Sequence, residues 1–182
     1  MGKTYMIHPQ NQSLFSFPGL RDALTDAQMV DFCEKTVINH VKIMGSAWEI
    51  SISTSGIPSM KNVFALEKIL MAVIPNVTGI KLVLRPPLAL TPENMALIWP
   101  ETINRMCEDF ISLKTVLWEA PWELKGQELI LFLPHEPGII LLKKKNFESL
   151  LNAELARVFA ENLRVTYRKQ PEQMEKLHQK QE

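Results

Sequence analysis

Cysteine and glycine are both scarce in this sequence. Its 182 residues include two cysteines, Cys33 and Cys107, which lie far apart and form no C-x-x-C pair. Disulfide scaffolds and cysteine-based zinc sites use more cysteines at closer spacing, so we expect two free, buried thiols in a reducing compartment. The seven glycines build neither a P-loop nor a G-x-G-x-x-G loop. The common nucleotide-binding signatures that depend on those loops are therefore excluded.

The sequence also lacks a long apolar segment. Residues 128–142 come closest, but His135, Glu136 and two prolines interrupt them. A membrane-spanning helix needs about 18 consecutive apolar residues. The first residues, MGKTYMIHPQNQ, contain no apolar core of signal-peptide length. We therefore expect a cytoplasmic protein with no membrane partner.

Neither sign of charge is in excess. Twenty Lys and Arg residues balance twenty Asp and Glu residues, and residues 1–90 carry eight basic and six acidic groups. Proteins that bind duplex nucleic acid by charge usually have a clear basic excess. The balance argues against such a binder, although it is compatible with a local basic patch.

No catalytic or metal-binding motif is present. His135-Glu136 lacks the second histidine, one helical turn later, that a zinc-protease helix requires. Glu108 and Asp109 are adjacent, and neighbouring side chains on a helix diverge by about 100°, so the two cannot flank one substrate. The four histidines are scattered at positions 8, 40, 135 and 178. We expect no catalytic residue, no metal site and no cofactor in this chain.

The composition is that of a globular protein, with 46% hydrophobic and 22% charged residues. Residues 1–34 are poorly patterned. After them, "TVINHVKIM" and "WEISISTS" flank Gly45-Ser46 and predict a β-hairpin. A helix from about residue 58 to residue 74 follows, with apolar residues at three- and four-residue spacing. "GIKLVLR" predicts the next strand.

The same order of elements recurs in the second half of the chain. A helix begins at Thr91-Pro92-Glu93 and runs to about residue 111, and Pro100 must kink or divide it. "WELKGQELILFL" predicts a hairpin that turns at Lys125-Gly126-Gln127. A helix from about residue 137 to residue 162 then leads to the strand "LRVTYRK".

These patterns predict an α+β protein with two small hairpin–helix–strand units joined by a helix. The repeat is one of architecture, because the two halves share little sequence identity. The predicted parts are a poorly patterned N-terminal segment, a first ββαβ subdomain, a helix plus second ββαβ subdomain, and a polar linker or tail. They cover residues 1–34, 35–88, 89–169 and 170–182, respectively.

Lys143, Lys144 and Lys145 form a run of three cations. In a helix that starts near residue 137 they occupy the first turns and point in three directions around the axis. Two interpretations remain open: solvated side chains whose stems cover apolar surface, or contacts to phosphate or to acidic residues of a partner. Cations in a first turn oppose the helix dipole, which mildly favours a functional reason for them. The tryptophans are expected in the core: Trp48, Trp99, Trp118 and Trp122.

The order of these landmarks resembles a known family. Five stretches are similar to the N-terminal region of PolC-type DNA polymerase III alpha subunits, the replicative polymerases of low-GC Gram-positive bacteria. They are "AWEISIST", "LEKILMAVIPNVTGIKLVLRP", "MALIWPETINRM", "WELKGQELILFLPHEPGIILLKKKNFESLL" and "ENLRVTYR". The similarity covers roughly residues 14–169. It implies a non-catalytic part of a DNA-directed DNA polymerase with 3′–5′ exonuclease, whose catalytic carboxylates lie in other domains.

The resemblance further implies that the second subdomain is KH-like and similar to the polymerase-binding domain of the clamp-loader tau subunit. The implied partners, in DNA replication, are the tau subunit and the remainder of the polymerase chain. The alternative is a module that binds single-stranded nucleic acid. A KH domain does so through a G-x-x-G loop, and Leu141 stands where a second glycine after Gly138 is needed, which argues against this alternative. Candidate contacts to a partner or to phosphate are Lys143, Lys144, Lys145, Arg164, Arg168 and Lys169.

Overall fold

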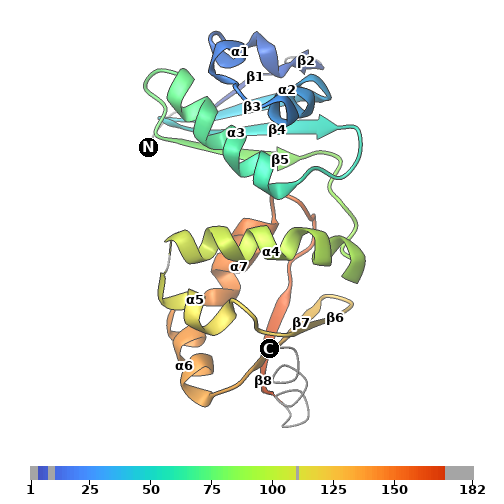
Figure 1. Cartoon of the computed structure of the whole chain (residues 1–182), viewed down its shortest axis with the longest axis vertical. Coiled ribbons are helices and arrows are strands. Elements are labelled where there is room, and N and C mark those ends of the chain that lie inside the picture. The colour runs from blue at the N-terminus through green and yellow to red at the C-terminus, as the bar shows by residue number, and fades with distance from the viewer. Residues whose placement is uncertain (1–3, 8–10, 110, 171–182) are drawn as a thin grey trace. The chain divides into compact units, whose positions relative to one another are not determined.

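The computed structural model of the chain describes residues 4–7, 11–109 and 111–170. The chain forms two compact units, each of mixed α and β structure with one small sheet (Figure 1). The first unit is the chain up to Leu88 together with Arg157–Ala160, and the second is Ala89–Ala156 and the chain from Glu161. The predicted α+β class is confirmed. The predicted polar tail, apart from Gln170, lies outside the described residues.

In the first unit, α3 lies across the sheet and contacts β5 (Figure 1). The strands run in the order β1-β3-β4-β5, and β2 also pairs with β3. β3 and β4 are antiparallel, whereas β4 and β5 are parallel. The elements are β1 (Thr4–Ile7), β2 (Gln12–Ser13), the 3-10 helix η1 (Leu14–Ser16), α1 (Leu20–Ala23), α2 (Ala27–Glu34), β3 (Thr36–Met44), β4 (Ala47–Thr54), α3 (Met60–Val73) and β5 (Gly79–Leu84).

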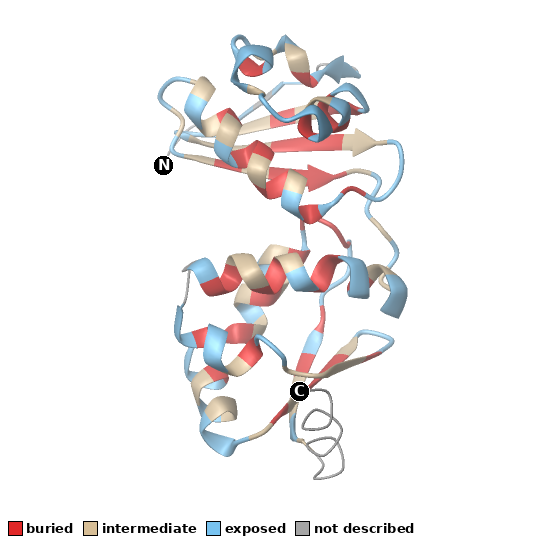
Figure 2. Cartoon of the chain, viewed as in Figure 1, coloured by how far each residue is buried: buried red, intermediate tan, exposed pale blue. Residues whose placement is uncertain are grey.

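The predicted hairpin of the first unit is formed by β3 and β4. Gly45 has φ 66°, the left-handed conformation that a tight turn requires and that glycine adopts without a steric cost. Ile38 pairs with Ile52 and Val41 pairs with Ile50, and all four side chains are buried. Figure 2 shows buried residues along the strands of this sheet. Ile38 and Val41 are three residues apart, and an irregularity between Ile38 and His40 keeps both on the same face as Ile50 and Ile52. Burial of these residues sets the register, because a slip of one residue would turn them to the opposite face.

Residues 1–34 contain more structure than their weak pattern indicated. Two short strands, η1, α1 and α2 all form there, and Leu14 and Leu20 are fully buried. α2 is capped by Asp26, whose Oδ1 accepts the Gln28 N–H at 2.8 Å. These elements are short, so their apolar residues show no periodicity that a sequence window can detect.

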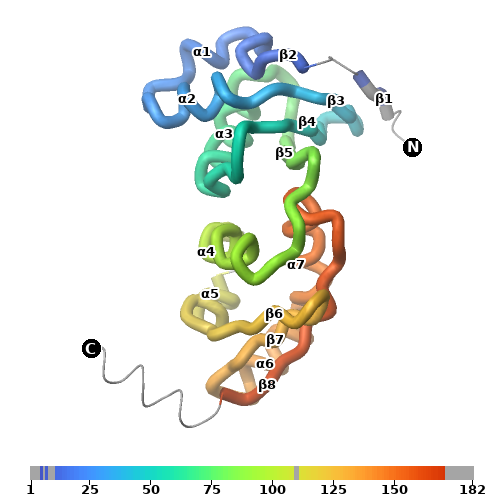
Figure 3. Tube along the Cα trace, turned by 90° about the vertical axis from the view of Figure 1, so that its right-hand side faces the viewer, coloured from blue at the N-terminus to red at the C-terminus, as the bar shows by residue number. Residues whose placement is uncertain are grey.

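The second unit repeats the strand pairing of the first. Its sheet has the order β6-β7-β8, with β6 and β7 antiparallel and β7 and β8 parallel, and Figure 3 shows the three strands edge to edge. α4 continues through Pro100, so the proline does not divide it. The elements are α4 (Pro92–Asp109), α5 (Ile111–Leu117), β6 (Trp122–Lys125), β7 (Glu128–Leu133), α6 (Glu136–Lys144), α7 (Phe147–Leu155) and β8 (Arg164–Lys169).

The single helix predicted over about residues 137–162 is wrong. It is two helices, α6 and α7, because Asn146 adopts the left-handed conformation with φ 52°. Asparagine tolerates that conformation better than most residues. The break lets the side chains of Leu142 on α6 and Phe147 on α7 both be fully buried. Lys143 and Lys144 consequently lie in the last turn of α6, not in a first turn, where cations are favoured by the helix dipole.

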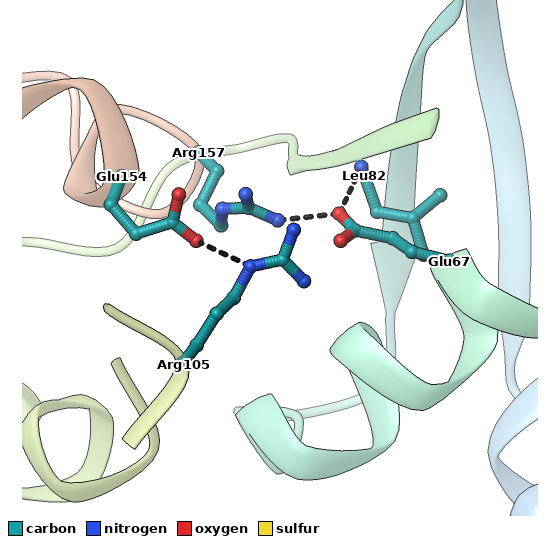
Figure 4. Close-up of polar contacts among 5 residues, drawn as sticks. All are labelled: Glu67, Leu82, Arg105, Glu154 and Arg157. Carbon is teal, nitrogen blue, oxygen red and sulfur yellow. Dashed lines mark hydrogen bonds and ion pairs between the residues drawn. The ribbon is translucent and has the colours of Figure 1, made fainter. Parts of the chain in front are cut away.

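The core of the second unit lies between α7 and one face of β7. Leu129, Leu131 and Leu133 alternate along β7 and are fully buried, as are Phe147 and Leu151 on α7. Asn152 ties α7 to the chain entering β8, because its side chain donates to the Leu163 carbonyl at 2.8 Å and accepts the Leu163 N–H at 2.7 Å. Arg105 on α4 forms an ion pair with Glu154 on α7, with 3.5 Å between Nε and Oε1 (Figure 4).

Arg157–Ala160 is a late segment of the chain that belongs to the first unit. Leu84 N–H donates to the Arg157 carbonyl at 2.7 Å, and Leu88 N–H donates to the Val158 carbonyl at 2.9 Å. The Arg157 guanidinium donates to Oε1 of the Glu67 carboxylate, which also accepts the Leu82 N–H at 2.7 Å (Figure 4). Both charged side chains are buried. No pattern in the sequence predicted that this segment belongs to the first unit.

The prediction that the two cysteines are free and buried is confirmed for Cys33 and Cys107. Burial raises the pKa of the Cys33 thiol to about 11 and also raises the pKa of Cys107. The tryptophan prediction holds in part. Trp99 is buried and its ring lies 5.8 Å from that of Trp122, centroid to centroid, but Trp118 is exposed.

Candidate interaction groove

An apolar groove lies in the second unit where α5 ends and α6 begins. Its volume is about 700 Å³. The walls are mainly apolar side chains, with a histidine at one side: Val116, Trp118, Ala120, Pro121, Pro134 and His135. A second hollow of about 510 Å³ shares Pro134, His135 and Gln170 with it and adds Pro137 and Ile139. We call the two together the Trp118 groove.

Trp118 is the largest side chain in the Trp118 groove. It follows α5 directly, and its N–H donates to the Lys114 carbonyl at 3.2 Å. The Lys114 ammonium lies 4.9 Å from the centre of the Trp118 ring, a cation–π contact that favours this position of the indole. The side chain is nevertheless 55% exposed. An aromatic ring held in place but open to water is a feature of interaction sites.

The amphipathic pattern of α5 explains why Trp118 points outward. Leu113 and Leu117, four residues apart, are both buried. Ile111 and Trp118 are seven residues apart and therefore share one side of the helix, a different side from that of the two leucines. Both are exposed. The core therefore takes one stripe of α5, and the second apolar stripe is left for solvent or for a partner.

Close packing of α5 and α6 shapes the floor of the Trp118 groove. Gly138, in the first turn of α6, faces Val116 of α5. A Cβ atom at Gly138 would lie 3.1 Å from Val116 Cγ1, closer than side chains normally approach. His135 is the N-cap of α6, and the following Pro137 suits the first turn, where its missing N–H costs nothing. The stretch "PHEPG" thus starts a helix beside the groove.

The six basic residues expected to contact a partner all lie in the second unit and are all exposed. Lys143 and Lys144 end α6, and Lys145 is its C-cap. Arg164, Arg168 and Lys169 belong to β8. Lys143 and Lys144 lie in α6 and Lys145 keeps a helical backbone, so the three lysines still point in different directions around the helix axis. Their placement relative to α7, however, does not follow from one long helix.

The strand β8 separates these cations instead of gathering them. Alternate side chains of a strand point to opposite faces. Val165 is buried toward the core, so Tyr167 and Lys169 share its face, whereas Arg164 and Arg168 are on the other. Lys143 lies near Tyr167, since both line a hollow of about 370 Å³. The structure therefore brings Lys143 to β8 but leaves Arg164 and Arg168 on the opposite side of the sheet.

Tyr167 is the perturbed titratable group of this region. Partial burial raises the pKa of its phenol to about 12, and the negative charge of Glu148 adds to the effect. The Glu148 carboxylate in turn accepts the Val165 N–H at 3.3 Å. The phenol therefore stays protonated near neutral pH and can donate a hydrogen bond to a ligand.

Sequence reasoning missed the Trp118 groove and placed Trp118 in the core. The signal that could have found it is the spacing of Leu113 and Leu117, which leaves Trp118 off the buried stripe of a short helix. That helix was not predicted separately, because the pattern through residue 111 was assigned to the preceding one. The sequence positions of Pro121 and Pro134 did not indicate a shared groove, because the two prolines come close together only through the pairing of β6 with β7.

In residues 4–7, 11–109 and 111–170, no group of three or more His, Cys, Asp or Glu residues is placed to hold a metal ion. None of the helices in those same ranges combines the length and apolar character needed to cross a membrane.

No protein-family model matches this chain, and no curated protein sequence matches it either.

Proposed function

We propose that this chain is a non-catalytic interaction module of a PolC-type replicative DNA polymerase III, acting in the cytoplasm. Its partner is the tau subunit of the clamp loader or another replisome component. The support is the order of landmarks over residues 14–169, together with a surface in the second unit that is suited to binding a protein. The second unit is taken as KH-like and similar to the polymerase-binding domain of tau. Its order of hairpin, helices and parallel closing strand is compatible with that comparison.

The observation that carries the proposal is the exposure of Trp118 in an apolar groove. Soluble proteins seldom leave large contiguous apolar surfaces in water unless a partner covers them. Tryptophan is also among the residues that contribute most to binding free energy at protein interfaces. Lys114, Glu119 and Glu136 add polar groups around the apolar walls. An apolar centre with a polar rim is the usual anatomy of a protein–protein contact.

The test is a calorimetric titration with the purified tau subunit of the organism that encodes this chain. Trp118→Ala is expected to weaken binding by about tenfold or more, because truncation of a central anchor removes its buried contacts. Leu97→Ala is the matched control. Leu97 is also an exposed apolar residue of the second unit, at 61% exposure, but it does not line the Trp118 groove. Equal affinity of the Trp118 variant and the wild type would refute the role of the groove.

Binding of single-stranded nucleic acid is the second candidate, favoured by the six exposed cations of the second unit. It predicts that affinity for a dT20 oligonucleotide falls linearly with salt on logarithmic axes. A double variant, Lys143→Glu with Lys169→Glu, would then weaken binding. It would also reduce the slope of log affinity against log salt concentration by the amount expected for the loss of about two phosphate contacts. No detectable binding of dT20 by the wild type at low salt would exclude this function.

A further inference from the structure

The outer edge of β8 offers backbone groups for hydrogen bonding. β8 is the last strand of the sheet β6-β7-β8. Arg164 N–H donates to the Gln127 carbonyl at 2.8 Å, and Gln170 N–H donates to the Leu133 carbonyl at 2.9 Å. In a parallel ladder, alternate residues bond to the same neighbour. The even-numbered residues of β8 therefore bond to β7, and the peptide groups of Val165, Tyr167 and Lys169 point away from the sheet.

One of these outward groups already has a partner. Val165 N–H donates to Glu148 Oε1 at 3.3 Å. By the same alternation, the backbone N–H groups of Tyr167 and Lys169 point away from β7. Two outward peptide groups in succession, with a spacing of two residues, match the hydrogen-bonding repeat of an added strand.

There is room for a chain along this edge. A hollow of about 370 Å³ runs between β8 and the turn that joins α6 to α7. Val165, Thr166 and Tyr167 form its β8 side, and Lys143 and Asn146 form the opposite side. Phe147, fully buried, lies at its base. An extended peptide placed here would touch the strand edge with its backbone and the turn with its side chains.

The charged side chains near the hollow indicate which kind of peptide would bind there. Lys143 lines the hollow, Lys144 and Lys145 follow it at the turn, and Lys169 ends the strand, and all four are exposed. Glu148 is the acidic residue that lines the hollow, and its Oε1 already accepts the Val165 N–H. Cations along an edge strand discourage pairing with a second copy of the same strand, because like charges would face each other. The same cations attract an acidic strand.

We propose that the edge of β8, together with the α6–α7 turn, binds an extended acidic peptide of a partner protein by strand addition. The backbone of the peptide pairs with Tyr167 and Lys169, and its acidic side chains face the lysines of the turn. The site does not include Trp118, although Lys169 at the end of β8 also lines the smaller hollow of the Trp118 groove. The inference rests on the edge of β8 and does not depend on the proposed function.

A peptide fits these observations better than a nucleic acid does. Strand addition uses the regular alternation of outward N–H and carbonyl groups, which β8 supplies. A KH-type clamp on a nucleic-acid backbone uses a glycine-rich turn between two helices. Here the turn is Lys143–Asn146, which contains no glycine. Arg164 and Arg168, on the other face of the sheet, cannot join Lys143 in one phosphate track.

The experiment titrates the full chain with the acetylated, amidated peptide EVEITVE at low salt, observed by backbone NMR. The expected result is saturable binding with shifts of the amide signals of Val165, Tyr167 and Lys169. The peptide KVKITVK and a copy of EVEITVE with alternate N-methylated residues serve as controls. We expect both to bind at least about tenfold more weakly, since one reverses the charge and the other cannot pair with a strand.

Lys169→Pro and Lys169→Ala are the matched variants. Both remove the ammonium group, but only proline also removes the outward N–H, and an edge strand tolerates proline at such a position. Lys169→Ala is expected to weaken binding of EVEITVE by about threefold at most, and Lys169→Pro by about tenfold. Glu148→Ala, which frees the Val165 N–H and removes a negative charge, is expected to tighten binding.

Several results would overturn the inference. Absence of EVEITVE binding at millimolar peptide would do so, as would equal affinity of the Lys169→Pro and Lys169→Ala variants. If Lys169→Pro does not fold, equal binding of the N-methylated and unmodified peptides to the wild type has the same meaning. Displacement of EVEITVE by dT20 at lower concentration than by unlabelled EVEITVE would assign the hollow to nucleic acid instead of a peptide.

Discussion

The ion pair between Arg157 and Glu67 provides the sharpest test of how the first unit is held together. The perturbation is Arg157→Met, which keeps an unbranched, apolar side chain in place of the aliphatic stem but removes the charge. Glu67 is 1% exposed and Arg157 is 3% exposed. The variant therefore leaves a carboxylate in the core without the guanidinium that neutralises it, although the Leu82 N–H still donates to Oε1.

The expected loss follows from this burial. Removing one partner of a buried ion pair typically costs about 3–5 kcal/mol, because the remaining charge is neither solvated nor paired. A domain has a free energy of unfolding of only about 5–15 kcal/mol, so the variant loses a large fraction of its stability. The contact of the Arg157 guanidinium with the Phe64 ring, 5.1 Å from the ring centre, is lost as well, and for a buried pair it adds about 2 kcal/mol.

The assay is urea unfolding followed by circular dichroism, with hydrogen exchange of the Leu82 amide as a local measurement. Lys35→Met is the matched control in the same unit, because Lys35 pairs with Asp31 at 2.6 Å while both side chains are more than half exposed. We expect that control to lose at most about 0.5 kcal/mol. A double variant, Glu67→Gln with Arg157→Met, is expected to be more stable than Arg157→Met by at least about 1 kcal/mol, since no buried charge remains.

The reasoning would be refuted if Arg157→Met lost less than about 1 kcal/mol, the range of an exposed pair. It would also fail if the double variant were less stable than Arg157→Met. A small loss in Arg157→Met would mean that the ion pair is solvated in solution. A double variant less stable than Arg157→Met would mean that the buried charge of Glu67 is not the source of the lost stability.

Three further outcomes are expected. The effect of Gly138→Ala on the free energy of unfolding, measured with urea, should be more favourable in a Val116→Ala background than in the wild type, because the new Cβ lies 3.1 Å from Val116 Cγ1. Additive effects of the two substitutions would show that α5 and α6 move apart freely. In a Tyr5→Phe protein, absorbance at 295 nm should report ionisation of Tyr167 near pH 12. The free energy of unfolding should fall as the pH rises from about 10 toward 12, because the unfolded state releases the phenolic proton first. Ionisation near pH 10 would contradict the burial of Tyr167. Cys33, whose pKa is raised to about 11, should react with a disulfide reagent at pH 8 far more slowly in the folded protein than in urea, and equal rates would mean that the thiol is accessible.

Local patterns in the sequence predicted the regular elements well. The two hairpins, the closing strands β5 and β8, and α3 were found because apolar residues recur with the period of each element. Gly45 and Gly126 marked the hairpin turns, and both have positive φ in the structure. The free, buried cysteines also followed from composition. These features depend on neighbours in the chain, so a sequence window contains the information that decides them.

Features that depend on distant neighbours were missed. The break at Asn146 separates α6 from α7, although the surrounding apolar residues are compatible with one helix. Trp118 was placed in the core by its residue type, whereas the buried stripe of α5 leaves it outside. The six candidate cations could be named from the sequence, but which of them share a face of β8 depended on the register with β7.

The sequence by itself determined the class of the fold, because the period of its apolar residues decides which segments become helices and which become strands. Only the tertiary structure decided that Arg157–Ala160 returns to the first unit, that Trp118 borders an open groove, and that one edge of β8 faces a hollow lined by Lys143. Each of these depends on contacts between residues far apart in the chain. Their free energy belongs to the packed arrangement and has no counterpart in any local pattern.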